Sequence, residues 1–209
     1  GCHMGQAGFL AGGMPFEGPF GVVYASNITQ DPTTGIGNWS DQEIIDAIRL
    51  GHAPDGEQLF PVMPYPTFSH MADEDVQNLV TFLRTVPPIE NSVPERQLKV
   101  EAPPFTAMAP PPATAPTSGV ERGAYIANAI SHCGDCHTPF NADGSPDFSK
   151  MLAGSFVEGQ LAPNITPDQE TGIGDWSEQD IAHLLKTGQR PGSEPPVGGL
   201  MLLSVEGGY

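Results

Sequence analysis

Apolar side chains recur at helical spacing in several stretches of the chain, and residues that begin or end helices bound each stretch. Residues 40–43 (Ser-Asp-Gln-Glu) form a capping box, and the isoleucines that follow predict a helix that ends at Gly51. Residues 177–180 (Ser-Glu-Gln-Asp) predict an equivalent helix that ends near Gly188. The same spacing predicts a longer helix over residues 73–84, which a Pro-Pro pair then stops.

A fourth helix is predicted from another capping box at residues 118–121, and it runs toward Cys133. Before it, residues 89–117 are rich in proline and predict an extended, semi-rigid linker. No stretch resembles a strand of a sheet, so the pattern predicts an all-α fold.

The chain also repeats itself once. Residues 27–40 reappear as residues 164–177 without a gap, at a constant offset of 137 residues. Both copies contain Asn-Ile-Thr, then Thr-Gly-Ile-Gly, then Trp-Ser. Two copies at this spacing indicate two similar domains rather than a solenoid.

Cys133, Cys136 and His137 form a Cys-x-x-Cys-His motif, which is the attachment pattern of a c-type haem. Each thiol can add across one vinyl group of the porphyrin, and the adjoining imidazole then binds the iron as its proximal ligand. A structural zinc site would need a second ligand pair, and a thioredoxin-like pair would not need His137. A disulfide between the two cysteines would close a short, strained loop. The motif therefore favours haem over these three alternatives.

The repeat predicts a second motif of this kind at the start of the sequence. Cys2 and His3 stand where its last two residues would be, so its first cysteine would precede Gly1. The alternative is that Gly-Cys-His-Met is a cloning remnant. Against this, the distance from the motif histidine to the repeated Asn-Ile-Thr differs by only three residues between the copies. We therefore expect two haem c groups.

The same alignment predicts the sixth iron ligands. Met63 lies 24 residues after Trp39, and Met201 lies 25 residues after Trp176, each beyond a loop rich in glycine or proline. A distal methionine opposite a proximal histidine raises the reduction potential of an electron carrier. Five other methionines have no partner in the other copy and are expected to be packing or surface residues: Met4, Met14, Met71, Met108 and Met151. The free histidines His52, His70, His132 and His183 also lack repeat partners, and we expect His132, next to the haem motif, to face solvent or the propionates rather than bind iron.

Trp39 and Trp176 each end the repeated glycine turn, so we expect them at equivalent places. They would either contact a haem edge, donate the indole N–H to a propionate, or pack as ordinary core residues. We also expect the glycines of the turn to adopt backbone angles that a side chain would oppose, namely Gly35, Gly37, Gly172 and Gly174.

Composition narrows the possible partners. The 209 residues carry a net charge of −17 with only 8 Lys and Arg, which excludes nucleic acid because phosphate binding needs basic patches. Hydrophobic residues make up only 38%, and bound haem would supply the missing apolar core. Covalent haem attachment implies export to the periplasm of a bacterium.

The repeated block, the Pro-Val-Met-Pro-Tyr segment around Met63 and the Cys-Gly-Asp-Cys-His-Thr-Pro segment together resemble a known family. They are similar to multihaem class I cytochromes c, the electron-transfer subunits of bacterial membrane-bound alcohol, gluconate and sorbitol dehydrogenases. The repeat and the linker at 89–117 predict two cytochrome c-like haem domains, over residues 1–88 and 118–209, the first without its N-terminal helix and the second without its final helix. The resemblance implies that such proteins usually carry three haem domains, an export signal and often a C-terminal membrane anchor.

This resemblance implies a non-enzymatic periplasmic protein, either free or attached to the inner membrane, that passes electrons from a dehydrogenase subunit to quinone or a terminal oxidase. Two alternatives are a dihaem peroxidase-like enzyme and one repeat of a haem-based filament. The peroxidase would need an iron with an open sixth position, and Met63 and Met201 argue against that.

Overall fold

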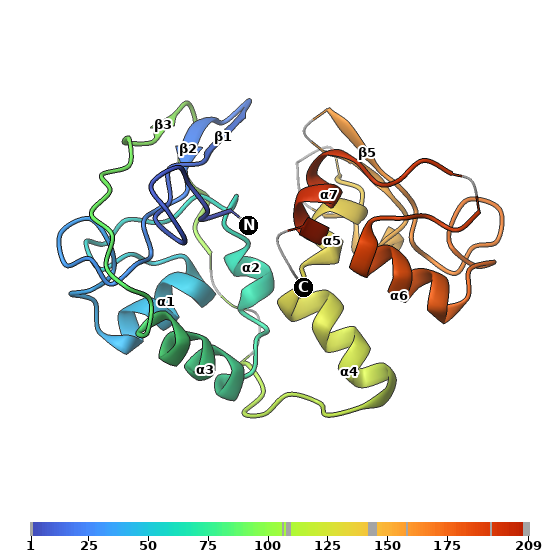
Figure 1. Ribbon diagram of the computed structural model, residues 1–209, viewed down its shortest axis with the longest axis horizontal. Coiled ribbons are helices and arrows are strands. Elements are labelled where there is room, and N and C mark those ends of the chain that lie inside the picture. Colours follow the sequence, from blue (N-terminus) through green and yellow to red (C-terminus); the bar gives the residue numbers. More distant parts are fainter. Residues whose placement is uncertain are drawn as a thin grey trace. The chain divides into compact units, whose positions relative to one another are not determined.

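The computed structural model describes residues 2–105, 107, 110–141, 146–157, 159–192 and 194–206. Gly1 and Met108, both named above, therefore lie outside the described residues. The chain forms two compact units, one over Cys2–His132 and one that begins at Cys133. Each unit is described by itself below, and Figure 1 labels the elements.

Helix α1 of the first unit follows the predicted caps closely, whereas the capping box predicted at residues 118–121 does not form, because Ser118 makes no side-chain hydrogen bond at the start of α4. Helix α1 covers Asp41–Leu50, and its N-terminus carries the full capping box, in which Ser40 and Glu43 each accept the other's backbone N–H. Gly51 ends the helix with a left-handed φ of 68°. The unit also contains α2 (Tyr65–Phe68), α3 (Asp73–Leu83), α4 (Gly119–Tyr125) and a π-helical turn, Ile126–Ile130.

The core of this unit lies between α1 and α3, which pack against each other. Their apolar faces meet in one cluster of buried side chains, which consists of Ile36, Ile44, Ile48, Met71, Val76, Val80 and Leu83. Helix α3 supplies three of these residues, Val76, Val80 and Leu83. Met63 and Trp39 are partly buried against the same cluster, so the core reaches the residues predicted to surround a haem.

The prediction of an all-α fold is wrong, because the described residues contain two small antiparallel sheets. The first joins β1 (Pro15–Gly18), β2 (Gly21–Tyr24) and β3 (Gln97–Leu98). The second joins β4 (Ser155–Val157) and β5 (Gln160–Ala162). These strands are two to four residues long, which is too short for an alternating pattern to stand out from the surrounding glycine and proline.

The proline-rich segment after α3 contacts the first unit at several points. Strand β3 pairs with β2, the Phe105 ring lies 5.3 Å from that of Tyr65, and Pro112 accepts the first backbone N–H of α3. Helix α4 then brings Tyr125 against Ala72, which lies just before α3. The segment therefore lies along the first unit.

In the second unit, the Cys-x-x-Cys-His motif itself forms helix α5, Cys133–His137. A 3₁₀ turn (Phe148–Lys150) and the β4–β5 hairpin follow. Helix α6 covers Glu178–Thr187 and has the predicted capping box, and Gly188 ends it with a φ of 71°. Helix α7 covers Gly199–Glu206.

Candidate haem-binding sites

The repeated block folds the same way in both units. In the first copy Asn27 Oδ1 accepts the backbone N–H of Thr29 at 3.0 Å, and Asn27 Nδ2 donates to Thr34 Oγ1 at 3.0 Å. In the second copy Asn164 makes the equivalent bonds at 2.8 Å and 2.9 Å. A buried or half-buried turn must satisfy its backbone groups internally, and these side chains do so.

The glycines of this turn are required for a reason other than the predicted one. None of the four has a φ in the left-handed region, so the expectation about backbone angles is wrong. Instead, a Cβ atom on Gly35 would lie 2.4 Å from the carbonyl oxygen of Thr29, and one on Gly172 would lie 2.3 Å from that of Thr166. The chain passes too close to itself for any side chain.

Each motif histidine is tied to this turn by its ring. His3 Nδ1 lies 2.8 Å from the carbonyl oxygen of Ser26, and His137 Nδ1 lies 2.7 Å from that of Pro163. Ser26 and Pro163 occupy equivalent positions, one residue before the repeated Asn-Ile-Thr. Since a carbonyl only accepts, Nδ1 carries the proton and Nε2 keeps its lone pair for a metal.

The main chain at each histidine is held in the same way. The N–H of Gly12 donates to the His3 carbonyl at 2.9 Å, and that of Gly154 donates to the His137 carbonyl at 2.7 Å. Burial lowers the pKa of His3 below its ordinary value, so its ring is neutral at neutral pH. A neutral imidazole is the form that binds a metal.

The cysteines are free thiols, so a disulfide between Cys133 and Cys136 does not form in this structure. Both are half-buried on α5, whereas Cys2 is exposed. Burial raises the pKa of Cys133, and the nearby Asp135 carboxylate raises it further, so this thiol stays protonated at neutral pH. Buried Thr138 follows the motif and accepts the N–H of Leu152, which anchors the end of α5.

The two candidate methionine ligands lie in different kinds of local structure. Met63 lies in the turn before α2, where its N–H donates to Phe60, and its side chain packs on the first core. Met201 is the third residue of α7 rather than part of a loop, because an apolar run without a helix breaker follows Gly199. Gln160 accepts the N–H of Leu200, which ties α7 to β5.

Trp39 and Trp176 have equivalent backbone positions, as expected. Each is half-buried, and its backbone N–H donates to the backbone carbonyl of the isoleucine three residues earlier, at 3.1 Å and 3.0 Å respectively. Trp39 packs on the core cluster that Met63 also contacts. The structure adds one residue that sequence patterns did not indicate, since Arg84 reaches from the end of α3 to the Trp39 carbonyl.

These donor sets fit a haem c group. A histidine with a free Nε2, a methionine in the same unit and, in the second unit, two free thiols on one helical turn are the groups that attach such a cofactor and bind its iron. Within the described part of the chain, no helix has both the length and the apolar character needed to cross a membrane.

Comparison with known proteins gives three informative relatives. The chain is 38% identical over 206 residues to the fructose dehydrogenase cytochrome subunit of Gluconobacter japonicus, covering 90% of this chain and 42% of that protein. It is 34% identical over 209 residues to the cytochrome c subunit of the quinone-type alcohol dehydrogenase of Gluconobacter oxydans, covering 90% of this chain and 44% of that protein. It is 35% identical over 196 residues to a diheme cytochrome c-type protein of Cereibacter sphaeroides, covering 87% of this chain and 64% of that protein.

These relatives confirm the resemblance inferred from the repeat and the motif. The chain spans less than half the length of the dehydrogenase subunits that it matches. No family model matches the chain.

Proposed function

Because the chain is a homologue of cytochrome c subunits of bacterial dehydrogenases over 90% of its length, we propose that it is an electron-transfer protein that carries two haem c groups. The observation that carries this proposal is the paired histidine contact. His3 and His137 are each tied through Nδ1 to equivalent carbonyls, which leaves both Nε2 atoms available for iron.

The chain's own residues would hold, orient and shield the cofactor. When bound, haem supplies a one-electron ferrous–ferric couple. His3 and Met63 would be the ligands in the first unit, and His137 and Met201 those in the second. Cys133 and Cys136 would form the two thioethers of the second unit, and Cys2 one thioether of the first. Trp39 and Trp176 would line the two sites and exclude water from them.

Relatives suggest the partners. Their names place them as cytochrome subunits of fructose, alcohol and gluconate dehydrogenases, so a dehydrogenase subunit is the proposed electron donor and this chain is not the catalytic subunit. Quinone or a terminal oxidase is the proposed acceptor, and the periplasm, with possible attachment to the inner membrane, is the proposed location. The net charge of −17 would favour a basic docking surface on either partner.

Peptide mass analysis of the purified protein, produced with the machinery that attaches haem, tests this proposal. Trypsin should release the peptide that spans residues 123–150 with one haem added to Cys133 and Cys136. A pyridine haemochrome assay should give one haem for each of the two copies of the repeat. A Cys133→Ser, Cys136→Ser variant should lose the haem on this peptide and keep the other. An unmodified peptide, or one with an internal disulfide, would rule out the assignment.

A further inference from the structure

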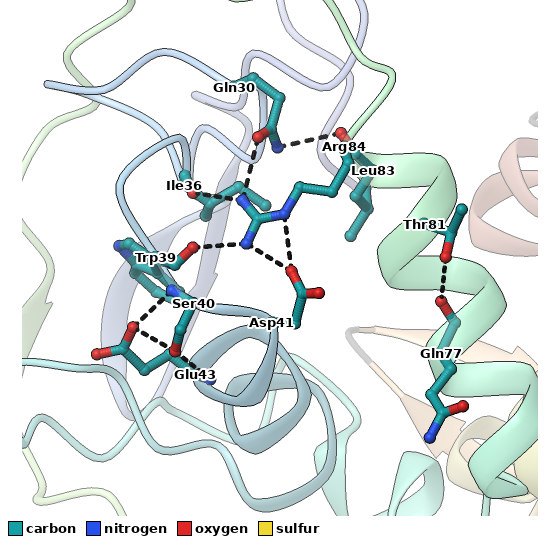
Figure 2. A network of polar contacts seen from close by, with 10 residues as sticks. All are labelled: Gln30, Ile36, Trp39, Ser40, Asp41, Glu43, Gln77, Thr81, Leu83 and Arg84. Atoms are coloured by element: carbon teal, nitrogen blue, oxygen red, sulfur yellow. Dashed lines mark hydrogen bonds and ion pairs between the residues drawn. The ribbon is translucent and has the colours of Figure 1, made fainter.

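Arg84 is the first residue after α3, and its side chain turns into the loop that forms the first copy of the repeat (Figure 2). Its guanidinium Nη2 donates to the backbone carbonyl of Trp39 at 2.6 Å. Nε and Nη2 both donate to Asp41 Oδ1, at 2.9 Å and 2.7 Å, and Nη1 donates to Gln30 Oε1 at 3.1 Å. One side chain therefore joins both ends of this loop to the end of α3.

The ion pair with Asp41 is not the main part of this contact. The Asp41 side chain is 70% exposed, and water screens most of the attraction between such groups. The bond to the backbone carbonyl of half-buried Trp39 is the part that reaches into the loop, and its loss would leave that acceptor without the charged donor it has here. The Gln30 amide, which also donates to the Leu83 carbonyl at 3.1 Å, completes the network around the helix end (Figure 2).

What this loop carries gives the network a functional meaning. Ile36 is buried in the first core cluster, and Trp39 and Met63 are partly buried against it. A shift of the loop would therefore move side chains that pack on the same cluster as the proposed methionine ligand. A loosened wall at this point would admit water, and a more polar surrounding favours the ferric form, which carries more positive charge.

We propose that Arg84 is a positioning residue that keeps the reduction potential of the first haem high, because it holds the Trp39 loop closed against the core. The proposal rests on the electron-transfer function proposed above. Arg84 would act on the potential through the planar arrangement of its guanidinium N–H donors, since only a guanidinium can donate to Trp39, Asp41 and Gln30 at once.

Reduction potentials of the full-length holoprotein test this role, with Arg84→Lys and Arg84→Gln compared with the wild type. We expect both variants to lower the potential of one haem, such that the ferrous-to-ferric ratio at a fixed applied potential falls roughly tenfold, or about 59 mV. Both should keep the wild-type haem count and weaken the far-red band of methionine-bound iron. When Met201→Ala is added to lower the potential of the second haem, the haem that still titrates at high potential should be the one whose potential the Arg84 variants shift.

The same measurements separate the other outcomes. If the lysine variant keeps the wild-type potential and the glutamine variant does not, charge rather than geometry acts, and the proposal is wrong. If both variants unfold more easily but titrate like the wild type, Arg84 is merely structural. Asp41→Asn is the matched control, because it removes the ion pair and leaves the Trp39 contact, and an equal fall in its potential would also overturn the proposal. A wild-type protein without haem would instead refute the electron-transfer function itself.

Discussion

Helix α3 depends on a residue far along the chain for the cap that its own sequence lacks. Its N-cap residue is Ala72, which has no side-chain acceptor and is fully buried. The hydroxyl of Tyr125, on α4, accepts the Ala72 N–H at 2.8 Å and donates to Asp75 Oδ2 at 2.7 Å. Burial and the Asp75 carboxylate raise the pKa of Tyr125, so the hydroxyl remains a donor at neutral pH.

Tyr125→Phe would remove one hydroxyl and change two bonds. The backbone N–H of Ala72 would be left buried without a partner, which costs about 1–3 kcal/mol. Loss of the bond to the Asp75 carboxylate would add about 1 kcal/mol, which is below the usual ~1.5–3 kcal/mol for a charged partner because Asp75 is only half-buried. We therefore expect the free energy of unfolding to fall by about 2–4 kcal/mol, while the ring keeps its packing on Ala129.

Urea unfolding of the holoprotein, followed by circular dichroism, measures this loss. The matched control is Tyr24→Phe, because Tyr24 is half-buried in β2 and its hydroxyl makes no hydrogen bond among the described residues. The control should stay within about 0.5 kcal/mol of the wild type, as is usual away from special contacts. If Tyr125→Phe is equally mild, water replaces the hydroxyl and α4 does not cap α3.

Other variants test the ligands and the repeated turn. Met201→Ala should lower the potential of one haem and open it to carbon monoxide while haem stays attached, whereas Met151→Ala should do neither, and the reverse result in optical titrations would exchange the two assignments. Gly35→Ala should destabilise the first unit by several kcal/mol because its Cβ would lie 2.4 Å from a carbonyl oxygen, whereas Gly123→Ala, in open space on α4, should stabilise it by about 0.5–1 kcal/mol in thermal unfolding. Backbone and hydroxyl donors of the turn lower the pKa of Asp31. The contribution of Asp31 to stability is therefore present above the ordinary carboxyl pKa and is lost as the pH falls through the lowered value. Asp31→Asn should reduce this loss of stability at acid pH, measured as the free energy of unfolding against pH.

Local rules were enough to predict α1, α3, α4 and α6, but they did not indicate α2, α5 or α7. Ser40 and Ser177 begin α1 and α6 as capping boxes, and Gly51 and Gly188 end them in the left-handed conformation. These signals lie within a few residues of the helix ends that they specify, so they can be recognised in the sequence without knowledge of the tertiary contacts. Helix α3 shows the limit of such rules, because its cap comes from Tyr125 and from the carbonyls of the proline-rich segment.

The sheets could not be predicted for the opposite reason. Strand β3 pairs Gln97 with Val22 and Leu98 with Gly21, so its partners lie about 75 residues earlier in the chain. Two residues cannot show an alternating pattern, and proline nearby favours an extended backbone whether or not a sheet is present. The error in fold class therefore arose from short strands whose identity depends on tertiary contact.

The histidine contacts show most clearly what only the structure could add. A backbone carbonyl has no residue signature, so neither Ser26 nor Pro163 could be chosen from the sequence as the partner of a ring nitrogen. The chain from His3 to Gly12 covers 9 residues and that from His137 to Gly154 covers 17, yet both pairs make the same backbone bond. The chain from Gly12 to Ser26 covers 14 residues and that from Gly154 to Pro163 covers 9, yet the contact between the histidine ring and the carbonyl recurs. The connecting loops thus vary in length while the two bonds at each histidine do not, which is the expected result if these bonds orient a metal ligand and the loops between them carry no such requirement.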